Sequence, residues 1–370
     1  MRPMKFLSSV VWTALALPAL AAPLAAQDID ARTMALIHDA VGSPPPAGSS
    51  ADPAALAEAR KALQDEKLLS SRRVATPEPD IVDIYGRALL LGTRARQFLP
   101  ELAEVRNAAI RRDREATAAA IDRLFVKAGR SKPDPAQMNR FVDAVTGAGE
   151  DEGPAETARR RVEKPGRTIE ITDAKRAGLF TIEVTSTPPG GQPTRTVVVA
   201  ERTVKPDSAG SGLEQRAAPV HVCTVTTAQA AERRAALNGA WSDQSGDAWD
   251  VSGAGEAITL LSRRGGKPAL AYTGTYRLGR IQATHLVGAP NEIDDLPDWV
   301  RAGLVGRTSF IVRLDDCSDG RLEGTWESRH VTYSPAFKTI SRIHDPYDLR
   351  LVLSRGGEGT ARGATDGEAP

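Results

Sequence analysis

The sequence predicts an α+β protein, with an N-terminal α-helical hairpin or bundle followed by a predominantly antiparallel β domain, a small barrel or sandwich. Two observations lead to this prediction. Residues 52–147 place apolar side chains three and four positions apart, which is the period of an amphipathic helix. Residues 219–355 alternate apolar and polar side chains in short runs separated by turn residues, as antiparallel strands do.

The chain begins with a pattern typical of a secretory signal peptide. Arg2 and Lys5 precede an apolar run, and small residues follow up to Ala26. We expect cleavage near Ala26 to remove residues 1–26, and we expect the mature protein to be periplasmic or secreted. Because no later stretch approaches about twenty consecutive apolar residues, a soluble mature protein without a membrane span is expected.

The helical part is predicted from helix starts and apolar periodicity. The N-terminal segment 27–51 contains one short helix and ends in a linker rich in Pro, Gly and Ser. Asp52 and Pro53 then form a helix N-cap and a first-turn proline. Further helices of the module are expected at residues 81–99, 102–125 and 134–147. The charged run 111–115 is interpreted as a solvated helix face, although it also suits partner binding.

Between the helices and the β domain, the sequence predicts a small sheet flanked by linkers. Residues 148–166 and 206–218 are polar and contain Gly and Pro, so both are predicted linkers. Residues 167–205 alternate in three runs, which predicts a three-stranded β meander. Three strands alone bury little area, so we expect the meander to dock, and whether it joins the β domain stays open. The tail 356–370 is expected to be disordered.

The β domain 219–355 carries the motif Gly-x-Trp twice, beginning at Gly239 and Gly324. The glycine lets the backbone bend or approach a neighbour, and the indole two residues later lies on the same face and can fill one end of a barrel. The run 239–246 resembles the opening strand and turn of avidin-like and lipocalin-like barrels. That resemblance is limited to this strand and its second copy, and no ligand residue follows from it.

The sequence contains two cysteines, Cys223 and Cys317. In an oxidising compartment an even pair usually forms one disulfide, which would join the strand before the barrel to a strand within it. Neither cysteine belongs to a CxxC motif or to a familiar Cys/His metal spacing. We therefore predict a disulfide and no metal site.

Composition and motifs narrow the function classes. Removing residues 1–26 takes Arg2 and Lys5 from 48 basic residues and leaves all 47 acidic residues, a balance that argues against a nucleic-acid partner. The sequence lacks a GxSxG elbow, a phosphate-binding glycine loop and an HExxH motif, so no cofactor is predicted. Acidic pairs at 294–295 and 315–316, with Asp319 nearby, could serve a glycosidase, although turn chemistry also explains the second group.

Aromatic side chains of the β domain are the candidates for ligand binding, because flat rings stack on sugars and fill apolar pockets. Core packing is the alternative for each of them, and a hydrogen-bonded structural role is the alternative for the histidine. The irregular stretch 288–306 is expected to lie over one mouth of the barrel and to border any site. The candidate residues are Trp249, Tyr272, Tyr276, His285, Trp299 and Tyr333.

These patterns favour a non-catalytic exported protein. Its β domain would bind a small ligand or carbohydrate, and its helical module would contact a protein or another cell-envelope partner. The alternative is a periplasmic or secreted hydrolase of glycosidase type that uses a carboxylate pair in the β domain, together with His285 or His330. Convergence of two acidic groups, or of a histidine and an acid, in one pocket would distinguish the two hypotheses.

Overall fold

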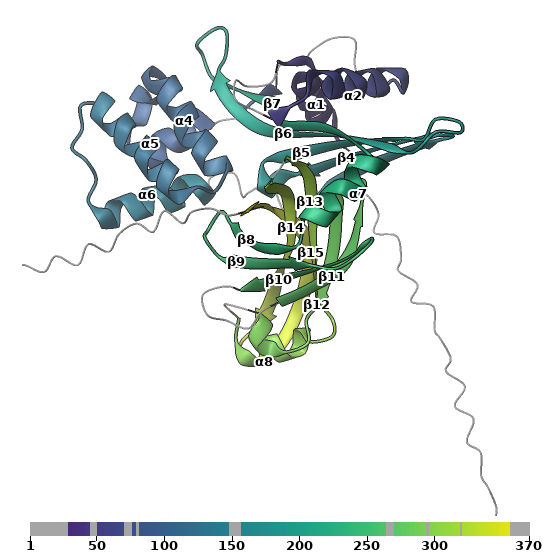
Figure 1. Ribbon diagram of the computed structural model, residues 1–370. Coiled ribbons are helices and arrows are strands. Elements are labelled where there is room, and N and C mark those ends of the chain that lie inside the picture. The colour runs from purple at the N-terminus through teal and green to yellow at the C-terminus, as the bar shows by residue number, and fades with distance from the viewer. Residues whose placement is uncertain are drawn as a thin grey trace, which may run out of the picture.

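The computed structural model describes residues 29–44, 50–69, 76–78, 81–147, 157–263, 270–293, 296–318 and 320–355. The predicted signal peptide 1–26 and the predicted tail 356–370 lie outside these residues. Within them the chain forms a helical module, a seven-stranded sheet and a closed barrel (Figure 1). The predicted α+β class, with helices first and antiparallel sheets after them, is confirmed. No helix in the described part of the chain combines the length and hydrophobicity needed to cross a membrane.

The elements follow one another from a helical half into a β half. The helices are α1 (Ala31–Gly42), α2 (Pro53–Asp65), α3 (Ile81–Ala88), η1 (Gly92–Phe98), α4 (Leu99–Ile110), α5 (Arg114–Lys127), α6 (Pro135–Gly147), η2 (Lys175–Ala177), α7 (Thr227–Ala236), η3 (Pro290–Glu292) and α8 (Asp298–Leu304). The strands of the sheet are β1 (Ser50–Ala51), β2 (Thr76–Pro77), β3 (Ala158–Lys164), β4 (Arg167–Ala174), β5 (Leu179–Ser186), β6 (Thr194–Pro206) and β7 (Leu213–Thr226). Those of the barrel are β8 (Gly239–Asp243), β9 (Ala248–Ser252), β10 (Ala257–Arg263), β11 (Leu270–Arg277), β12 (Arg280–Leu286), β13 (Ser309–Ser318), β14 (Arg321–Ser334) and β15 (Thr339–Arg355).

The helical module α3–α6 folds around its own apolar core and packs against the ends of β6 and β7 through Val204 and Leu213. Two of its predicted helices are wrong in extent, because each is interrupted by a residue with left-handed backbone. Leu90, with φ of +57°, separates α3 from η1 within 81–99, and Arg112, with φ of +55°, separates α4 from α5 within 102–125.

The charged run 111–115 is therefore a helix-to-helix turn and not the exposed face of one helix. Asp113 caps α5, since its carboxylate accepts a hydrogen bond of 2.8 Å from the backbone N–H of Ala116. The same rule confirms the predicted start at Asp52, whose side chain accepts from Ala54 ahead of α2. Apolar periodicity continued across the turn, which is why the sequence pattern alone joined the two helices.

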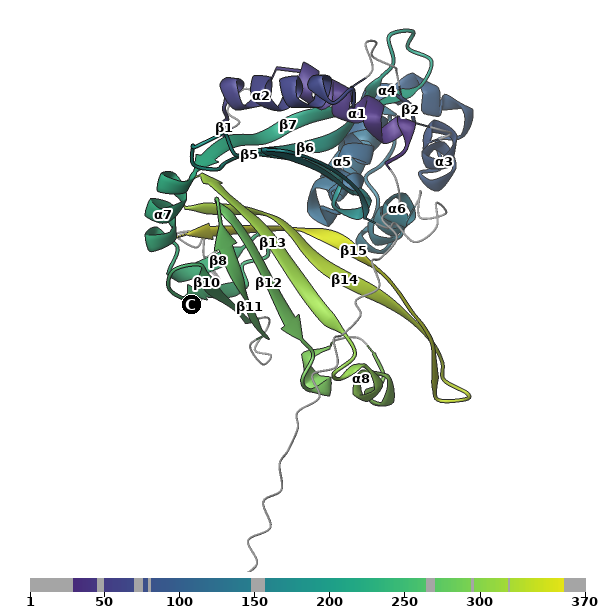
Figure 2. The same ribbon diagram turned by 90° about the vertical axis from the view of Figure 1, so that its right-hand side faces the viewer.

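The first sheet has the order β1-β7-β6-β5-β4-β3, and β2 also pairs with β7. Strands β4 to β6 of the predicted meander pair with one another and with β3 and β7, so they belong to this sheet and not to the barrel. Helices α1 and α2 pack on one face, and the barrel lies against the other (Figure 2).

Two of the predicted linkers contain strands. Strand β3 lies within 148–166, and β7 begins within 206–218. β3 was missed because it is an edge strand with the charged sequence Ala-Arg-Arg-Arg-Val-Glu-Lys, and charges are a common feature of sheet edges. β7 was missed at its start because Glu214 and Gln215 are polar although the surrounding structure buries them. The boundaries of the predicted domains stay a prediction.

Eight antiparallel strands close the barrel in the order β10-β11-β12-β13-β14-β15-β8-β9. Alternate residues face inward, so that Leu260 of β10 lies opposite Tyr272 of β11 and both are buried. The interior is filled by side chains of all eight strands, and the same apolar cluster continues into the facing side of β6 and β7. The long hairpin β14–β15 extends beyond the barrel wall (Figure 2).

The two Gly-x-Trp copies use different properties of glycine. A Cβ atom at Gly324 would lie 2.0 Å from the carbonyl oxygen of Arg313 on the neighbouring strand, so only glycine fits there. Gly239 has φ of +127°, and a Cβ atom there would meet only the Arg355 side chain at 3.5 Å, an ordinary contact, so the glycine serves the bend into β8. Trp241 of the first copy is buried in the barrel core, and Trp326 of the second is partly buried against the same cluster, where it contacts Phe310.

Cys223 at the end of β7 and Cys317 near the end of β13 lie at disulfide distance, as the two-cysteine count predicts. Their Cα atoms are 5.7 Å apart, which is within the normal range for a disulfide. The bond joins the first sheet to the barrel, and such a covalent link across a long loop restricts the unfolded chain more than the folded one.

Candidate functional site

Five of the six candidate residues fall into two groups inside the β half. Trp249, Tyr272 and His285 form a row through the barrel interior, with ring centroids 5.8 Å and 5.5 Å apart. Trp299 and Tyr333 meet edge to face at 5.7 Å in a separate cluster beneath α8. Whether any of these residues binds a ligand stays a prediction, but the first three are buried and fill the core.

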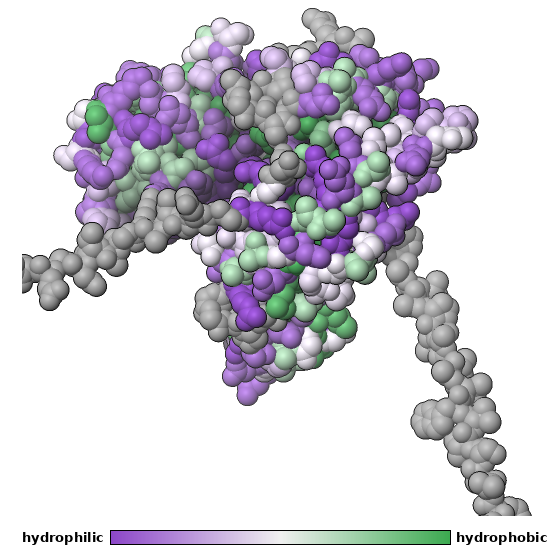
Figure 3. All heavy atoms as spheres, viewed as in Figure 1, coloured by the Kyte–Doolittle hydropathy of each residue, from purple (hydrophilic) through white to green (hydrophobic). Residues whose placement is uncertain are grey.

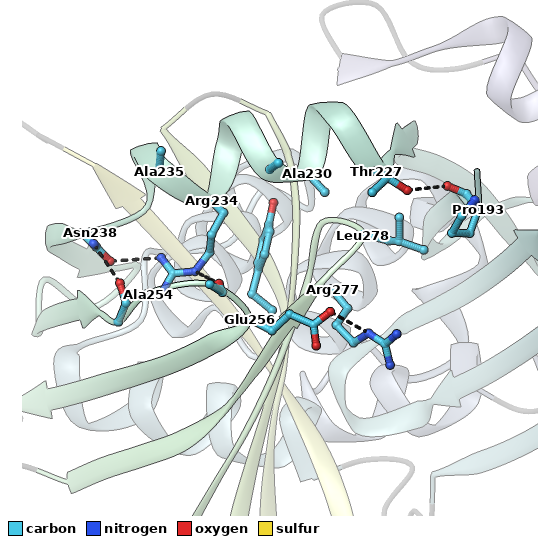
Figure 4. A pocket seen from close by; sticks show the side chains of 14 residues that line it. Pro193, Thr227, Ala230, Arg234, Ala235, Asn238, Ala254, Glu256, Arg277 and Leu278 are labelled. Carbon is cyan, nitrogen blue, oxygen red and sulfur yellow. Dashed lines mark hydrogen bonds and ion pairs between the residues drawn. The ribbon is translucent and has the colours of Figure 1, made fainter. Parts of the chain in front are cut away.

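A pocket of about 480 Å³ opens at the end of the barrel beside α7 (Figure 4). This volume is of the size that binds small organic molecules. Its walls come from α7, from the loop between β9 and β10, and from the turn between β11 and β12. The lining residues are Pro193, Thr227, Ala230, Ala231, Arg234, Ala235, Asn238, Gly253, Ala254, Gly255, Glu256, Tyr276, Arg277 and Leu278. Of the six candidates only Tyr276 belongs to this lining, and the stretch 288–306 does not contribute to it.

Helix α7 is fixed over the barrel by a capping box at its start. The backbone N–H of Gln229 donates to the Thr226 hydroxyl at 3.2 Å, and the Thr226 N–H donates to the Gln229 side chain at 3.0 Å. The helix presents the methyl groups of Ala230, Ala231 and Ala235 to the pocket, so this wall is apolar and shallow.

Arg234 closes the inner end of the pocket, and its charge is already engaged. Its guanidinium donates to the carbonyl oxygens of Gly255 at 3.0 Å and Ala257 at 2.7 Å, and to the side chain of Asn238 at 3.1 Å. Arg234 is 7% exposed. These bonds hold the β9–β10 loop against α7, so the residue builds the wall and leaves little hydrogen-bonding capacity for an anion.

Tyr276 forms part of the floor. Its hydroxyl donates to the Asp316 carboxylate at 3.0 Å. Burial and the Asp316 carboxylate raise the pKa of Tyr276 far above its ordinary value, so the phenol stays neutral. The Asp316 carboxylate also lies 3.6 Å from the guanidinium of Arg233 on α7, which ties the floor to the helix.

Leu278 has strained backbone where it lines the pocket. The two-residue turn Leu278-Gly279 joins β11 to β12, and both residues have positive φ, +46° and +75°. Such turns favour Asn-Gly, and a leucine with positive φ is uncommon. Strain of this kind at a pocket supports a functional role for the side chain.

Replacing Leu278 by asparagine is expected to stabilise the protein and weaken ligand binding. Asparagine adopts this backbone more readily, so the free energy of unfolding should rise by about 1 kcal/mol in urea titrations. Leu90→Asn is the matched control, because Leu90 has the same left-handed backbone, is 67% exposed and does not line the pocket. Binding that is unchanged in Leu278→Asn would show that the side chain does not serve the pocket.

A second polar centre lies where the first sheet meets the barrel. Arg195 of β6 is 2% exposed and donates to Glu183 of β5 at 3.0 Å and to Asp315 of β13 at 2.5 Å. Arg280 of β12 also contacts Glu183. Opposite charges are thus paired across the interface, and the arrangement fits a structural role.

Of the acidic residues considered for a hydrolase, the structure describes Asp315 and Asp316, and their side chains do not face one another as a pair. Asp315 and Asp316 are neighbours on β13 and engage different partners, Arg195 on the sheet side and Tyr276 on the pocket side. Residues 294, 295 and 319 lie outside the described residues, as does the side chain of His330.

The pairing of Glu183 predicts a loss of stability in acid. Burial raises the pKa of its carboxyl, but Arg195 and Arg280 outweigh burial and lower the pKa from 4.5 to about 2. A carboxyl whose pKa is lowered by folding contributes stability above its unfolded pKa and loses it as pH falls through the folded value. This shift corresponds to roughly 3 kcal/mol. The difference in unfolding free energy between the native protein and Glu183→Gln should shrink from about pH 5 to about pH 2, and a constant difference would contradict this assignment.

His285 fastens the start of the irregular stretch 288–306 to the barrel. Its Nδ1 lies 2.9 Å from the carbonyl oxygen of Ala271, and its Nε2 lies 3.0 Å from the Glu292 carboxylate. Both partners are acceptors, so each of these bonds requires a proton on the ring nitrogen that faces it. The backbone N–H of Gly288 donates to the same carboxylate, and although burial raises the pKa of Glu292, these bonds outweigh it and lower the pKa. This geometry fits a structural role, in which His285 links β11 to the start of the stretch 288–306.

Sequence reasoning missed most of the pocket. Arg234 and the three alanines lie on a short helix whose composition carries no site signal. Leu278-Gly279 was detectable, because two residues between alternating runs predict a tight turn, and leucine is unusual there. The histidine beside the disulfide was also missed. Its spacing carried a signal, because His221 and Cys223 are two residues apart on one strand and therefore share a face.

The described residues offer one pocket of ligand size beside α7, one charged interface between sheet and barrel, and one disulfide that joins them. Comparison with known proteins adds no assignment: no protein-family model, no curated protein and no solved structure matches this chain.

Proposed function

We propose that this chain is an exported, non-catalytic binding protein that holds a small, mainly apolar ligand in the pocket between α7 and the end of the barrel. The observation that carries the proposal is the saturation of the polar groups around the pocket. Arg234, Asn238, Thr227 and Tyr276 all hydrogen-bond to other protein atoms. What remains for a ligand is mainly alanine methyl groups, Leu278 and backbone.

The rim of the pocket supports a ligand with one polar end. Glu256 and Arg277 lie on the rim with their charged groups 3.4 Å apart, and both side chains are exposed. An exposed ion pair contributes little to stability and is easily rearranged. A ligand can therefore direct a hydroxyl or carboxyl group to this rim while its apolar part lies against α7. This orientation favours an apolar molecule over a carbohydrate, whose many hydroxyls would lack partners inside.

Export and partner contacts complete the proposal. The cysteine pair at disulfide distance is compatible with an oxidising compartment, and the N-terminal sequence pattern favours secretion. The helical module is proposed to contact a partner. Its face in Figure 3 is mainly hydrophilic with scattered hydrophobic residues, and Val126 on this module is 72% exposed.

Filling the pocket is expected to abolish binding. Ala231→Phe places a ring in the space beside α7, so the affinity for the uncharged apolar dye N-phenylnaphthylamine should fall at least about tenfold, a loss of about 1.4 kcal/mol. The measurement is a fluorescence titration of the mature full chain. Ala236→Phe is the matched control, because Ala236 is exposed on the same helix and does not line the pocket. Equal losses in both variants, or no loss in Ala231→Phe, would contradict the assignment of the pocket.

A further inference from the structure

His221 lies beside the disulfide that joins the sheet to the barrel. His221 and Cys223 are two residues apart on β7, so their side chains leave the same face of the strand, and Cys317 reaches them from β13. One ligand atom from each residue, an imidazole nitrogen and the two sulfurs, lies within 4.8 Å of the others. His221 is 2% exposed and Cys223 is 9% exposed, whereas Cys317 is only partly buried.

These three atoms have the chemistry of a zinc site once the disulfide is opened. Zinc binds thiolate sulfur at about 2.3 Å and imidazole nitrogen at about 2.0 Å, so ligands on one tetrahedral ion lie roughly 3 to 4 Å apart. All three atoms lie within 4.8 Å of one another. Once the disulfide is opened, the two sulfurs must move apart and the imidazole nitrogen must approach them to reach this geometry. A Cys₂His set leaves the fourth position for water.

Charge selects the ion. Two thiolates and one neutral imidazole carry a charge of −2, which Zn²⁺ cancels. A monovalent soft ion such as Cu⁺ would leave a net negative charge in a largely buried place, which is costly. Asp315 and Asp316 precede Cys317 directly, so their carboxylates bring further negative charge near the cluster and add to that cost.

We propose that reduction of the Cys223–Cys317 disulfide creates a zinc site formed by His221, Cys223 and Cys317, so that the sheet and the barrel are joined by a disulfide in one redox state and by a metal ion in the other. The step needs a dithiol reductant. The reductant's two thiols give up two electrons and two protons and become a disulfide, while the Sγ–Sγ bond breaks and each sulfur takes one proton. Zn²⁺ then displaces both protons on binding.

The test is a Co²⁺ titration of the mature full chain after reduction with a phosphine, which does not itself supply thiol ligands. The sequence contains only these two cysteines, so a thiolate-to-cobalt absorption band in the near ultraviolet reports this site alone. We expect one Co²⁺ per reduced chain, displacement by Zn²⁺, and no band from the oxidised chain. His221→Ala should weaken Co²⁺ binding at least about tenfold, whereas His38→Ala, which changes a histidine on α1, should leave it unchanged.

Thermal unfolding gives a second readout that does not depend on colour. Zn²⁺ should raise the Tm of the reduced protein and leave that of the oxidised protein unchanged, because only the reduced native state binds the ion. The proposal is overturned if the reduced chain shows no thiolate band, if His221→Ala binds Co²⁺ as tightly as the native sequence, or if Zn²⁺ leaves the reduced Tm unchanged. An unchanged Tm would also be found if the reduced chain were unfolded and bound metal only through disordered thiols, so this measurement detects that case.

Discussion

Replacing Trp249 by alanine is expected to lower the free energy of unfolding by about 3 to 5 kcal/mol, measured by urea denaturation and far-ultraviolet circular dichroism. Trp249 is 1% exposed and stacks on Tyr272 in the middle of the barrel. Its removal leaves a large cavity whose walls cannot collapse, because strands on all sides fix them. It also leaves one oxygen of Asp243 without the indole N–H that donates to it at 3.2 Å.

The conservative variant separates these two contributions. Trp249→Phe retains a ring but removes the N–H, so its cost should be about 1 to 3 kcal/mol, the penalty for a buried acceptor that loses its donor together with some packing. The same pair of variants distinguishes a core residue from a ligand-binding one. If Trp249→Ala had the same urea midpoint as the native protein but had lost affinity for ligand, the structural role would be contradicted. The prediction that Trp249 binds a ligand would then be supported.

Replacing Arg195 by alanine is expected to cost about 3 to 5 kcal/mol, because it leaves Glu183 and Asp315 close together without their shared cation. These two carboxylates, with Asp315 buried, raise the pKa of Arg195 despite the opposing effect of burial, which shows how strongly the charged guanidinium is held. The measurement is again the urea-unfolding free energy, at low and high salt. A buried pair responds little to salt, so the cost should persist.

Two further variants test whether the loss of stability in Arg195→Ala comes from the charged interface between the sheet and the barrel. Arg161→Ala removes an arginine of β3 that is exposed and pairs with Glu163 at 2.6 Å, and it should change stability by less than about 0.5 kcal/mol. Combining Arg195→Met with Glu183→Gln and Asp315→Asn should recover much of the loss, because the three charges are removed together and Arg280, which loses Glu183, is partly exposed to solvent. A cost for Arg195→Ala as small as that for Arg161→Ala would show that the network does not hold the sheet on the barrel.

Much of the β half was predictable because its strands alternate regularly. Strands β11 and β12 alternate buried and exposed residues, which is the pattern that predicts strands in 219–355. The outer part of the long hairpin β14–β15 lacks this signal, since its tip carries Pro335 and Phe337, and Phe337 is 81% exposed. Alternation describes a strand only where one side is buried.

The helical half shows where local patterns fail. A helix break caused by one residue with positive φ, such as Leu90 or Arg112, does not disturb the spacing of apolar residues. The pattern therefore predicted one helix where the structure has two. The edge strand β3 has the opposite problem: its charged sequence forms a strand because β4 supplies the hydrogen bonds. In both cases a neighbouring element decides the local structure.

The pocket could not be predicted because its walls are far apart in the sequence and chemically plain. Alanines on α7 meet the β9–β10 loop only because Arg234 ties that loop to the helix. Of the predicted aromatic residues, Trp249 and Tyr272 lie in the barrel core, where large rings fill space well. The stretch 288–306 does not line this pocket, and its role beside a ligand site stays a prediction.

The most direct test of the binding function is a thermal-unfolding screen of the mature full chain, with its disulfide intact, against fatty acids, isoprenoid alcohols, aromatic acids and simple sugars. A ligand present at about 100 times its Kd stabilises the native state by roughly 2.7 kcal/mol, which is a shift of several degrees in Tm. We expect such a shift with one apolar class, and none with that class in Ala231→Phe. Shifts with sugars alone, shifts that persist in Ala231→Phe, or no shift with any apolar class would contradict the account.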